Sequence, residues 1–179
     1  MDLRMDLGMD LKEHIRSIPD FPKPGILFYD IATLLREPVA FEAAVARLAA
    51  LTERHRPERL MAIESRGFIF GAALARHLGI GLGMIRKQGK LPGSVIGHAY
   101  DLEYGEDTIE VSADLIAPGL RVVVVDDLIA TGGTAAASIE LLRKVGAEVA
   151  AAVFLIELEG LDGRSRLDVP VERVLTYAG

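Results

Sequence analysis

The sequence predicts an α/β protein with a parallel, doubly wound sheet and a small hood. Two β-α-β runs are the main observation, because a strand that returns through a helix lies parallel to the strand before it. Composition agrees: 50% of the 179 residues are hydrophobic and only 6% are aromatic, which suits a sheet covered by Ala-rich helices. The predicted strands are 60–63, 82–85, 121–125, 149–156 and 171–177, and the predicted helices are 39–54, 68–77 and 134–145.

Each predicted element follows from a local pattern. The helix over 39–54 places Phe41, Val45 and Leu48 on one face, and the helix over 68–77 is closed by Gly79. The valine run before Asp126 is continuous, as in strands that are buried on both faces.

Four further segments complete the organisation of the chain. Residues 1–14, which repeat the triplet MDL, are expected to be a disordered lead-in or a short amphipathic helix, followed by one domain over 15–179. Residues 19–25, PDFPKPG, form an extended turn because proline cannot occupy a helix interior. Residues 89–111 are polar and contain glycine, with weak alternation, which indicates a β-ribbon or a flexible arm.

The composition also excludes several classes of site. The net charge is −6, so no general basic field is available to hold nucleic acid, and any polyanion must meet a local cluster of cations. The chain contains no cysteine, which excludes disulfides and thiolate metal sites. The longest apolar run, around 149–156, is too short to span a membrane, and the N-terminus does not resemble a signal peptide.

The segment VVVVDDLIATGGT, residues 122–134, predicts an anion site. It leads from a strand into a helix, and ligands of open α/β sheets lie beyond the carboxyl ends of the strands. The glycines allow close backbone approach, and the free N–H groups of the helix start form a cradle with the threonine hydroxyls. The segment lacks both GxxxxGK[ST] and GxGxxG, so it is neither a nucleotide P-loop nor a dinucleotide fingerprint. The cradle residues are Ala130, Thr131, Gly132, Gly133 and Thr134.

Asp126 and Asp127 directly precede this cradle. Carboxylates repel a phosphate, so these two must face another group. At this position carboxylates can accept hydrogen bonds from ribose hydroxyls and stabilise a developing positive charge. The alternative is a strand end with solvated acids and a glycine turn, which the length of the pattern argues against.

The same segment resembles the phosphoribosyl-pyrophosphate motif of the type I phosphoribosyltransferases. The resemblance implies that residues 130–134 wrap the 5-phosphate and that Asp126 and Asp127 lie against the ribose. It also implies the type I phosphoribosyltransferase fold, a twisted parallel sheet with a hood.

Two groups of cations follow predicted strands and are candidates for holding pyrophosphate. Arg66 lies in ESRGF after the strand 60–63, and Arg86, Lys87 and Lys90 lie in RKQGK after the strand 82–85. Both groups fall on the rim that carries the phosphate cradle, although ordinary surface charge is the alternative for each alone. ESRGF and RKQGKLPG resemble the adenine phosphoribosyltransferase family, which implies that Ser65 and Arg66 contact pyrophosphate and that the bond before Arg66 is a cis peptide.

The segment FPKPGILFYDI, residues 21–31, resembles the adenine-binding stretch of that family. The resemblance implies that the main chain of Leu27 and Tyr29 reads the base and that Phe28 stacks on it. Relatives often carry Arg where Tyr29 stands, so base affinity depends on whether that side chain is used. The alternative for Phe28 is a place in the core.

Residues 89–111 resemble the mobile loop that covers the family's active site. Glu103 and Tyr104 match the pair at the tip of that loop, and Glu103 is the expected proton-handling group near N7 of the base. The alternative is a charged hairpin tip. Mg²⁺ is expected to arrive with the pyrophosphate, held mainly by substrate oxygens and with no ligand directly from the protein.

The resemblance spans residues 15–177 and implies an enzyme of purine salvage. The implied reaction transfers the 5-phosphoribosyl group from phosphoribosyl pyrophosphate to N9 of adenine, giving AMP and pyrophosphate. The alternatives are an enzyme for another base such as xanthine, hypoxanthine or orotate, and a regulator that senses phosphoribosyl pyrophosphate. We further expect a cytoplasmic homodimer, with Arg86 and Lys87 near the contact, that binds neither nucleic acid nor membrane.

Overall fold

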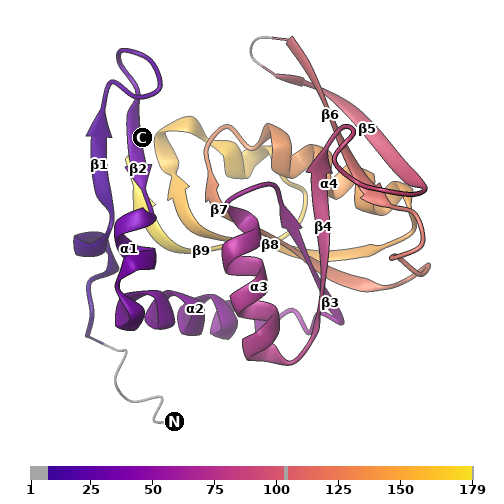
Figure 1. Ribbon diagram of the computed structural model, residues 1–179, viewed down its shortest axis with the longest axis horizontal. Helices are drawn as coiled ribbons and strands as arrows, with labels where there is room; N and C mark the ends of the chain where they lie inside the picture. Colours follow the sequence, from indigo (N-terminus) through magenta and orange to yellow (C-terminus); the bar gives the residue numbers. More distant parts are fainter. Residues whose placement is uncertain (1–7, 103–104, 179) are drawn as a thin grey trace.

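A computed structural model describes residues 8–102 and 105–178. Among these residues, seven strands form one sheet in the order β5-β6-β4-β3-β7-β8-β9 (Figure 1). Strands β4, β3, β7, β8 and β9 are parallel, whereas β6 is antiparallel to β4 and β5. The predicted α/β fold with a mostly parallel sheet is therefore confirmed. The strands are β3 (Arg59–Ile63), β4 (Gly81–Lys87), β5 (Val95–Leu102), β6 (Gly105–Ser112), β7 (Arg121–Ile129), β8 (Glu148–Leu158) and β9 (Val171–Tyr177).

Helices cover both faces of the sheet and divide the core into two clusters. The valines of β7 alternate between them: Val123 and Val125 face α2 and α3, whereas Val122 and Val124 face α4. The core therefore depends on the register of this central strand. The helices are α1 (Ala32–Arg36), α2 (Pro38–Glu53), α3 (Gly67–Leu78) and α4 (Gly133–Lys144), with 3₁₀ turns η1 (Leu11–His14), η2 (Glu159–Leu161) and η3 (Gly163–Arg166).

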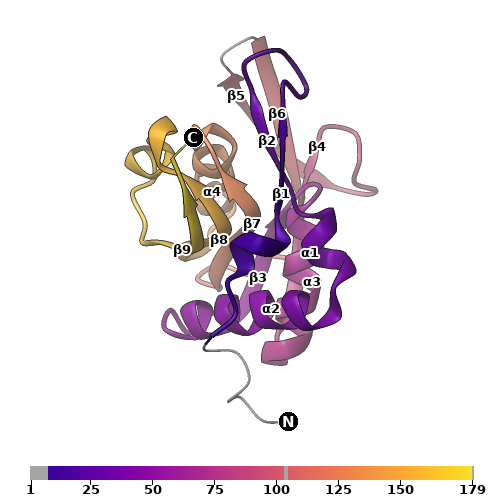
Figure 2. The same ribbon diagram turned by 90° about the vertical axis from the view of Figure 1, so that its left-hand side faces the viewer.

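The predicted hood is a separate antiparallel hairpin. Strands β1 (Arg16–Pro19) and β2 (Leu27–Asp30) pair with each other, and the turn between them contains the proline-rich segment. Leu11, in the preceding 3₁₀ turn, is fully buried, so this part of the expected lead-in packs on the core. The predicted β-ribbon of residues 89–111 is the hairpin of β5 and β6. Figures 1 and 2 show both hairpins projecting beyond the same edge of the sheet, with the hairpin of β5 and β6 opposite the hood.

Two strands are longer than the sequence predicts, and the extensions carry site residues. We expected Asp126 and Asp127 to follow a strand, but β7 continues to Ile129 because β8 supplies partners up to that point. Arg86 and Lys87 were likewise expected to follow a strand that ends at Ile85, but they lie within β4, paired with β6. The acids and these cations are thus held by the sheet rather than by loops.

Helix α3 packs on β3 at a glycine. A Cβ placed on Gly71 would lie 2.7 Å from the Cβ of Ala62, which is closer than carbon atoms approach in proteins. Glycine is therefore required where this helix meets the sheet.

Gly71→Ala is expected to lower the melting temperature by about 3–8 °C, because overpacking costs roughly 1–3 kcal/mol. Gly81→Ala is the matched control, since its Cβ would meet only the flexible Arg59 side chain at 3.4 Å. Scanning calorimetry of both variants measures the difference. Equal melting temperatures for the two would contradict the packing argument.

Candidate active site

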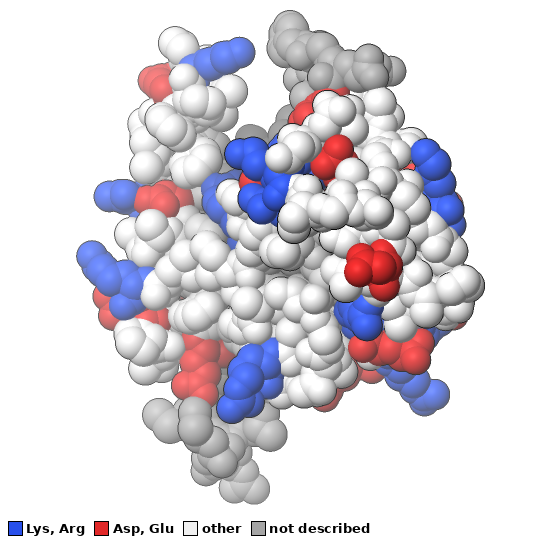
Figure 3. Space-filling view, turned by 45° about the vertical axis from the view of Figure 1, so that its right-hand side comes forward, with Lys and Arg blue, Asp and Glu red and all other residues white. Residues whose placement is uncertain are grey.

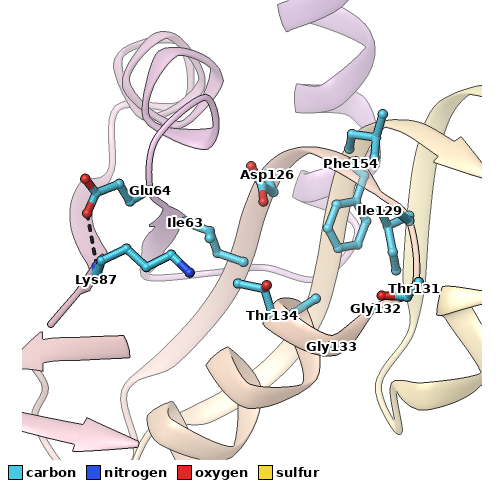
Figure 4. A pocket seen from close by; sticks show the side chains of 13 residues that line it. Ile63, Glu64, Lys87, Asp126, Ile129, Thr131, Gly132, Gly133, Thr134 and Phe154 are labelled. Atoms are coloured by element: carbon cyan, nitrogen blue, oxygen red, sulfur yellow. Dashed lines mark hydrogen bonds between the residues drawn. The ribbon is translucent and has the colours of Figure 1, made fainter. Parts of the chain in front are cut away.

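A cavity of about 190 Å³ opens at the carboxyl end of β7 (Figure 4). Its walls come from β3, β4, β7, the loop that follows β7 and the start of α4. The lining residues are Ile63, Glu64, Lys87, Asp126, Leu128, Ile129, Ala130, Thr131, Gly132, Gly133, Thr134, Ala135 and Phe154. All five predicted cradle residues are among them.

The cradle itself is a tight turn into a helix. Gly132 has φ +77°, in the left-handed region that favours glycine, and α4 begins at the next residue. The first N–H groups of α4 have no partner within the helix and are available to an anion at this end.

The two acids differ in their surroundings. Asp126 lines the cavity, whereas Asp127 is buried and accepts no hydrogen bond at Oδ2 from any described residue. The Asp127 N–H donates to Oδ1 of Asp126 at 2.8 Å. Burial raises the pKa of Asp126 well above its usual range, with repulsion from Asp127 adding to it, and burial likewise raises the pKa of Asp127. The site therefore holds two carboxylates whose ionisation is opposed.

Arg66 relieves part of this charge and links the acids to the hood. Its Nε lies 3.0 Å from Oδ2 of Asp127, although the angle is too poor for a hydrogen bond. Its guanidinium carbon also lies over the Phe28 ring, 5.1 Å from the centroid. Arg66 thus contacts both Asp127, which is predicted to face the ribose, and Phe28, which is predicted to stack on the base.

Glu64 holds the end of β4 in place. It accepts hydrogen bonds from Nε and Nη2 of Arg86, at 3.2 and 3.3 Å, and from the backbone N–H of Lys87 at 3.0 Å. The hydrogen bond from Arg86 is the main reason that the pKa of Glu64 is lowered. Arg86 is therefore engaged within the described structure and does not line the cavity, so its predicted contact with pyrophosphate stays a prediction.

The Lys87 side chain points into the cavity but is also paired (Figure 4). It contacts the Asp107 carboxylate and donates to the Tyr100 hydroxyl at 3.2 Å, and Tyr100 lies 3.2 Å from the Thr134 hydroxyl. Burial opposes the charge on Lys87, but the hydrogen bonds to Asp107 and Tyr100 outweigh it and raise the pKa. Side chains of the β5–β6 hairpin thus contact both Lys87 and Thr134 of the cradle.

The non-proline cis peptide lies one bond earlier than expected. We predicted it before Arg66, but it joins Glu64 to Ser65. Arg66 has helical angles, φ −71° and ψ −27°, and caps α3, so the chain reverses before it. Ser65 is exposed and lies outside the cavity lining, as does Lys90.

The three predicted base-binding residues lie on β2 and differ in exposure. Leu27 is exposed and Phe28 is partly buried, with its ring 5.1 Å from that of Phe21, so Phe28 is not a core residue. The Tyr29 side chain is buried and packs on Tyr177, with ring centroids 4.1 Å apart. Only the main chain of Tyr29 is therefore available to a base. Glu103 and Tyr104 lie outside the described residues.

Several site residues were not singled out from the sequence. Glu64, Tyr100 and Asp107 are polar residues in strands or turns, and no pattern distinguishes them from surface residues. Gly163 lies after β8, and only its close backbone contact with Ala130, which is distant in sequence, connects it to the site.

Charge on the surface follows this arrangement. Figure 3 shows Lys and Arg side chains gathered near the centre of the upper part of this face, with acidic side chains directly beside them and others scattered over the rest of the face. A local cationic patch on an acidic protein is what the sequence analysis required for a polyanion.

The sequence matches the family described as phosphoribosyl transferase domain over residues 33–177. It is 63% identical to the adenine phosphoribosyltransferase of Acidiphilium cryptum, over 94% of this chain and 99% of that protein. The chain belongs to the adenine phosphoribosyltransferase family. The predicted family and enzyme class are thereby confirmed.

Solved structures of adenine phosphoribosyltransferases share the fold. The Rhodothermus marinus enzyme superposes with a TM-score of 0.88 at 49% identity, covering 93% of this chain and 96% of that one. The Saccharomyces cerevisiae enzyme, solved with adenine and an imino-altritol bisphosphate, gives 0.87 at 40% identity, covering 92% and 96%.

Two features are absent from the part of the chain that the structure describes. The described residues contain no group of three or more His, Cys, Asp or Glu side chains arranged to hold a metal ion. Over the same residues, no helix has the length and apolar character needed to cross a membrane.

Asp126→Asn is expected to raise the melting temperature at pH 7.5 by about 2–4 °C, because the folded state pays for an ionised, buried carboxylate. The pKa of Asp126 is raised on folding, so this cost is absent near pH 4 and grows as the pH rises. Thermal melts from pH 4 to 8 measure it, with the exposed Asp114→Asn as control. A lower melting temperature for Asp126→Asn at pH 7.5 would contradict it.

Asp107→Asn is expected to tighten the binding of magnesium pyrophosphate about threefold, because the carboxylate competes for Lys87. Asp168→Asn is the matched control, since it frees Arg143 away from the cavity. Titration calorimetry compares the two, and unchanged or weaker binding in Asp107→Asn would count against competition.

Proposed function

We propose that this protein transfers the 5-phosphoribosyl group from phosphoribosyl pyrophosphate to N9 of adenine, producing AMP and pyrophosphate. The observation that carries the proposal is Oδ2 of Asp127, a buried carboxylate oxygen that faces Arg66 at 3.0 Å but accepts no hydrogen bond from any described residue, one residue from a cavity lined by the anion cradle. A buried acceptor of this kind requires a donor, and a ribose hydroxyl supplies one.

The proposed roles follow the positions of the groups. The cradle of residues 130–134 holds the 5-phosphate, and Asp126 and Asp127 face the sugar. Both acids also oppose the positive charge that develops on the ribosyl carbon as the bond to pyrophosphate loosens. N9 then attacks from the opposite face, with inversion.

Cations of the rim receive the leaving group. Lys87 points into the cavity and exchanges Asp107 for a pyrophosphate oxygen, and Arg66 moves from Asp127 and Phe28 toward the same anion. Ser65, Arg86 and Lys90 complete this set in our proposal.

The base binds under the hood. Arg66 now covers the Phe28 ring, so an adenine stacked there replaces the guanidinium. The free edge of β2, which has no strand partner among the described residues, offers main-chain groups of Leu27 and Tyr29 to the exocyclic amine and ring nitrogens. Glu103 handles the proton near N7, and Tyr104 is the second residue that the family resemblance assigns to this step.

Mg²⁺ enters with the pyrophosphate in this proposal. The Asp126 carboxylate lies in the cavity wall, where its charge favours a nearby cation, and the ion is held by substrate oxygens and water with no direct bond to the protein. When bound, the ion neutralises charge on the leaving group. A homodimer and a cytoplasmic location, both implied by the family, belong to the same proposal.

The function is tested by product formation from phosphoribosyl pyrophosphate, Mg²⁺ and adenine, hypoxanthine or xanthine in parallel. We expect AMP to form fastest, and faster turnover of hypoxanthine or xanthine would overturn the choice of base. Asp127→Asn is expected to lower kcat on the order of 10²-fold, because a carboxylate facing positive charge is lost.

Asp114→Asn, an exposed carboxylate far from the cavity lining, controls for the loss of one negative charge. Near-normal kcat in Asp127→Asn would remove that residue from the mechanism. No product with any base, together with tight binding of phosphoribosyl pyrophosphate, would indicate a sensor rather than an enzyme.

A further inference from the structure

The segment after β8 packs directly against the phosphate cradle. A Cβ on Gly163 would lie 2.2 Å from the carbonyl oxygen of Ala130, and a Cβ on Gly132 would lie 2.3 Å from the carbonyl oxygen of Gly163. The two backbones are therefore in contact with no side chain between them. Residues 159–166, which form η2 and η3, therefore pack against the outer side of the cradle and do not line the cavity.

Ion pairs to the buried carboxylate of Glu157 hold this segment in place. Glu157, near the end of β8 and paired with Ile129 of β7, receives Nε and Nη2 of Arg164 at 2.9 and 2.8 Å. Nη1 of Arg164 donates to the Val171 carbonyl at 2.9 Å, and Arg173 approaches Glu157 at 2.9 Å. A two-pronged arginine–carboxylate pair sets direction as well as distance.

Arg166 is the arginine of this segment that has no carboxylate partner among the described residues. It is exposed, and it makes no hydrogen bond or ion pair with any described residue. Its Nη1 lies 3.7 Å from the point where a Cβ on Gly133 would stand, at the first residue of α4. Arg164 and Arg143, its neighbours in sequence or in space, are both paired with carboxylates.

The cradle itself lacks a cation. Residues 130–134 contain no Lys or Arg, and Lys87, which lines the cavity, is paired with Asp107. Backbone N–H groups and hydroxyls alone would face a phosphate dianion. A guanidinium at Gly133 adds full charge and paired donors to that set.

We propose that Arg166 is a binding residue for the 5-phosphate, carried to the cradle by the Glu157–Arg164 pair and the Gly163 contact. The inference rests on the proposed function only in that the cradle takes a sugar phosphate. In the proposed function Lys87 and Arg66 bind the pyrophosphate. Arg166 is then a separate cation that binds the other end of the substrate, the 5-phosphate.

The test compares two ligands that each carry one end of the substrate. Ribose 5-phosphate and magnesium pyrophosphate are titrated by calorimetry into the wild type, Arg166→Gln, Arg166→Lys and the exposed control Arg76→Gln. For Arg166→Gln we expect about tenfold weaker ribose 5-phosphate binding and unchanged pyrophosphate binding. Arg166→Lys recovers part of the loss, and Arg76→Gln loses nothing.

Kinetics give a second readout. Arg166→Gln is expected to raise KM for phosphoribosyl pyrophosphate about tenfold, with KM for adenine and kcat unchanged. Melting temperatures close to that of the wild type show that the fold is intact, as expected for a side chain without a described partner.

Each other outcome overturns the assignment. Unchanged ribose 5-phosphate affinity in Arg166→Gln, while the wild type consumes adenine, refutes Arg166 and leaves the proposed function standing. Equal losses for both ligands show a general charge effect and also refute it. A wild type that does not use adenine but loses ribose 5-phosphate affinity through Arg166→Gln refutes the function alone. A wild type that binds no ribose 5-phosphate and forms no AMP refutes both.

Discussion

Two adjacent carboxylates at the end of a buried strand are the constraint on which the site depends. Burial opposes the charge on Asp126 and Asp127, and the strand holds them in place because β7 pairs with β3 up to Val125 and with β8 as far as Ile129. The surrounding structure accommodates this cost. Arg66 approaches Asp127, and a Cβ on Gly67 would stand only 2.8 Å from Oδ1 of Asp126, so the start of α3 closes over the acids only as glycine.

The same strand explains why so much of the fold was predictable. Four valines that alternate between two clusters give an unambiguous buried strand, and the β-α-β order fixes its neighbours. The cradle was predictable because its glycines and threonines are contiguous. Strand ends were less predictable, because β7 reaches Ile129 only through partners that β8 supplies from a distant part of the chain.

The parts of the site that escaped prediction are contacts between distant segments. Nothing local distinguishes Asp107 from other acids, and only the hairpin of β5 and β6 brings it to Lys87. The cis peptide was placed one bond late, since it joins Glu64 to Ser65 and no local pattern in the sequence marks which bond of this turn is cis. Gly163 became significant only where its backbone meets Ala130.

The stacking of Tyr29 on Tyr177 has an optical consequence. The chain contains four tyrosines and no tryptophan, so its near-ultraviolet emission comes from tyrosine alone. Tyr29 joins the hood to β9, and Tyr100 lies between Lys87 and Thr134 at the cavity. The unmodified protein therefore carries tyrosines on the hood side and beside the cradle, and we expect a ligand that displaces either contact to change the tyrosine emission without an attached dye.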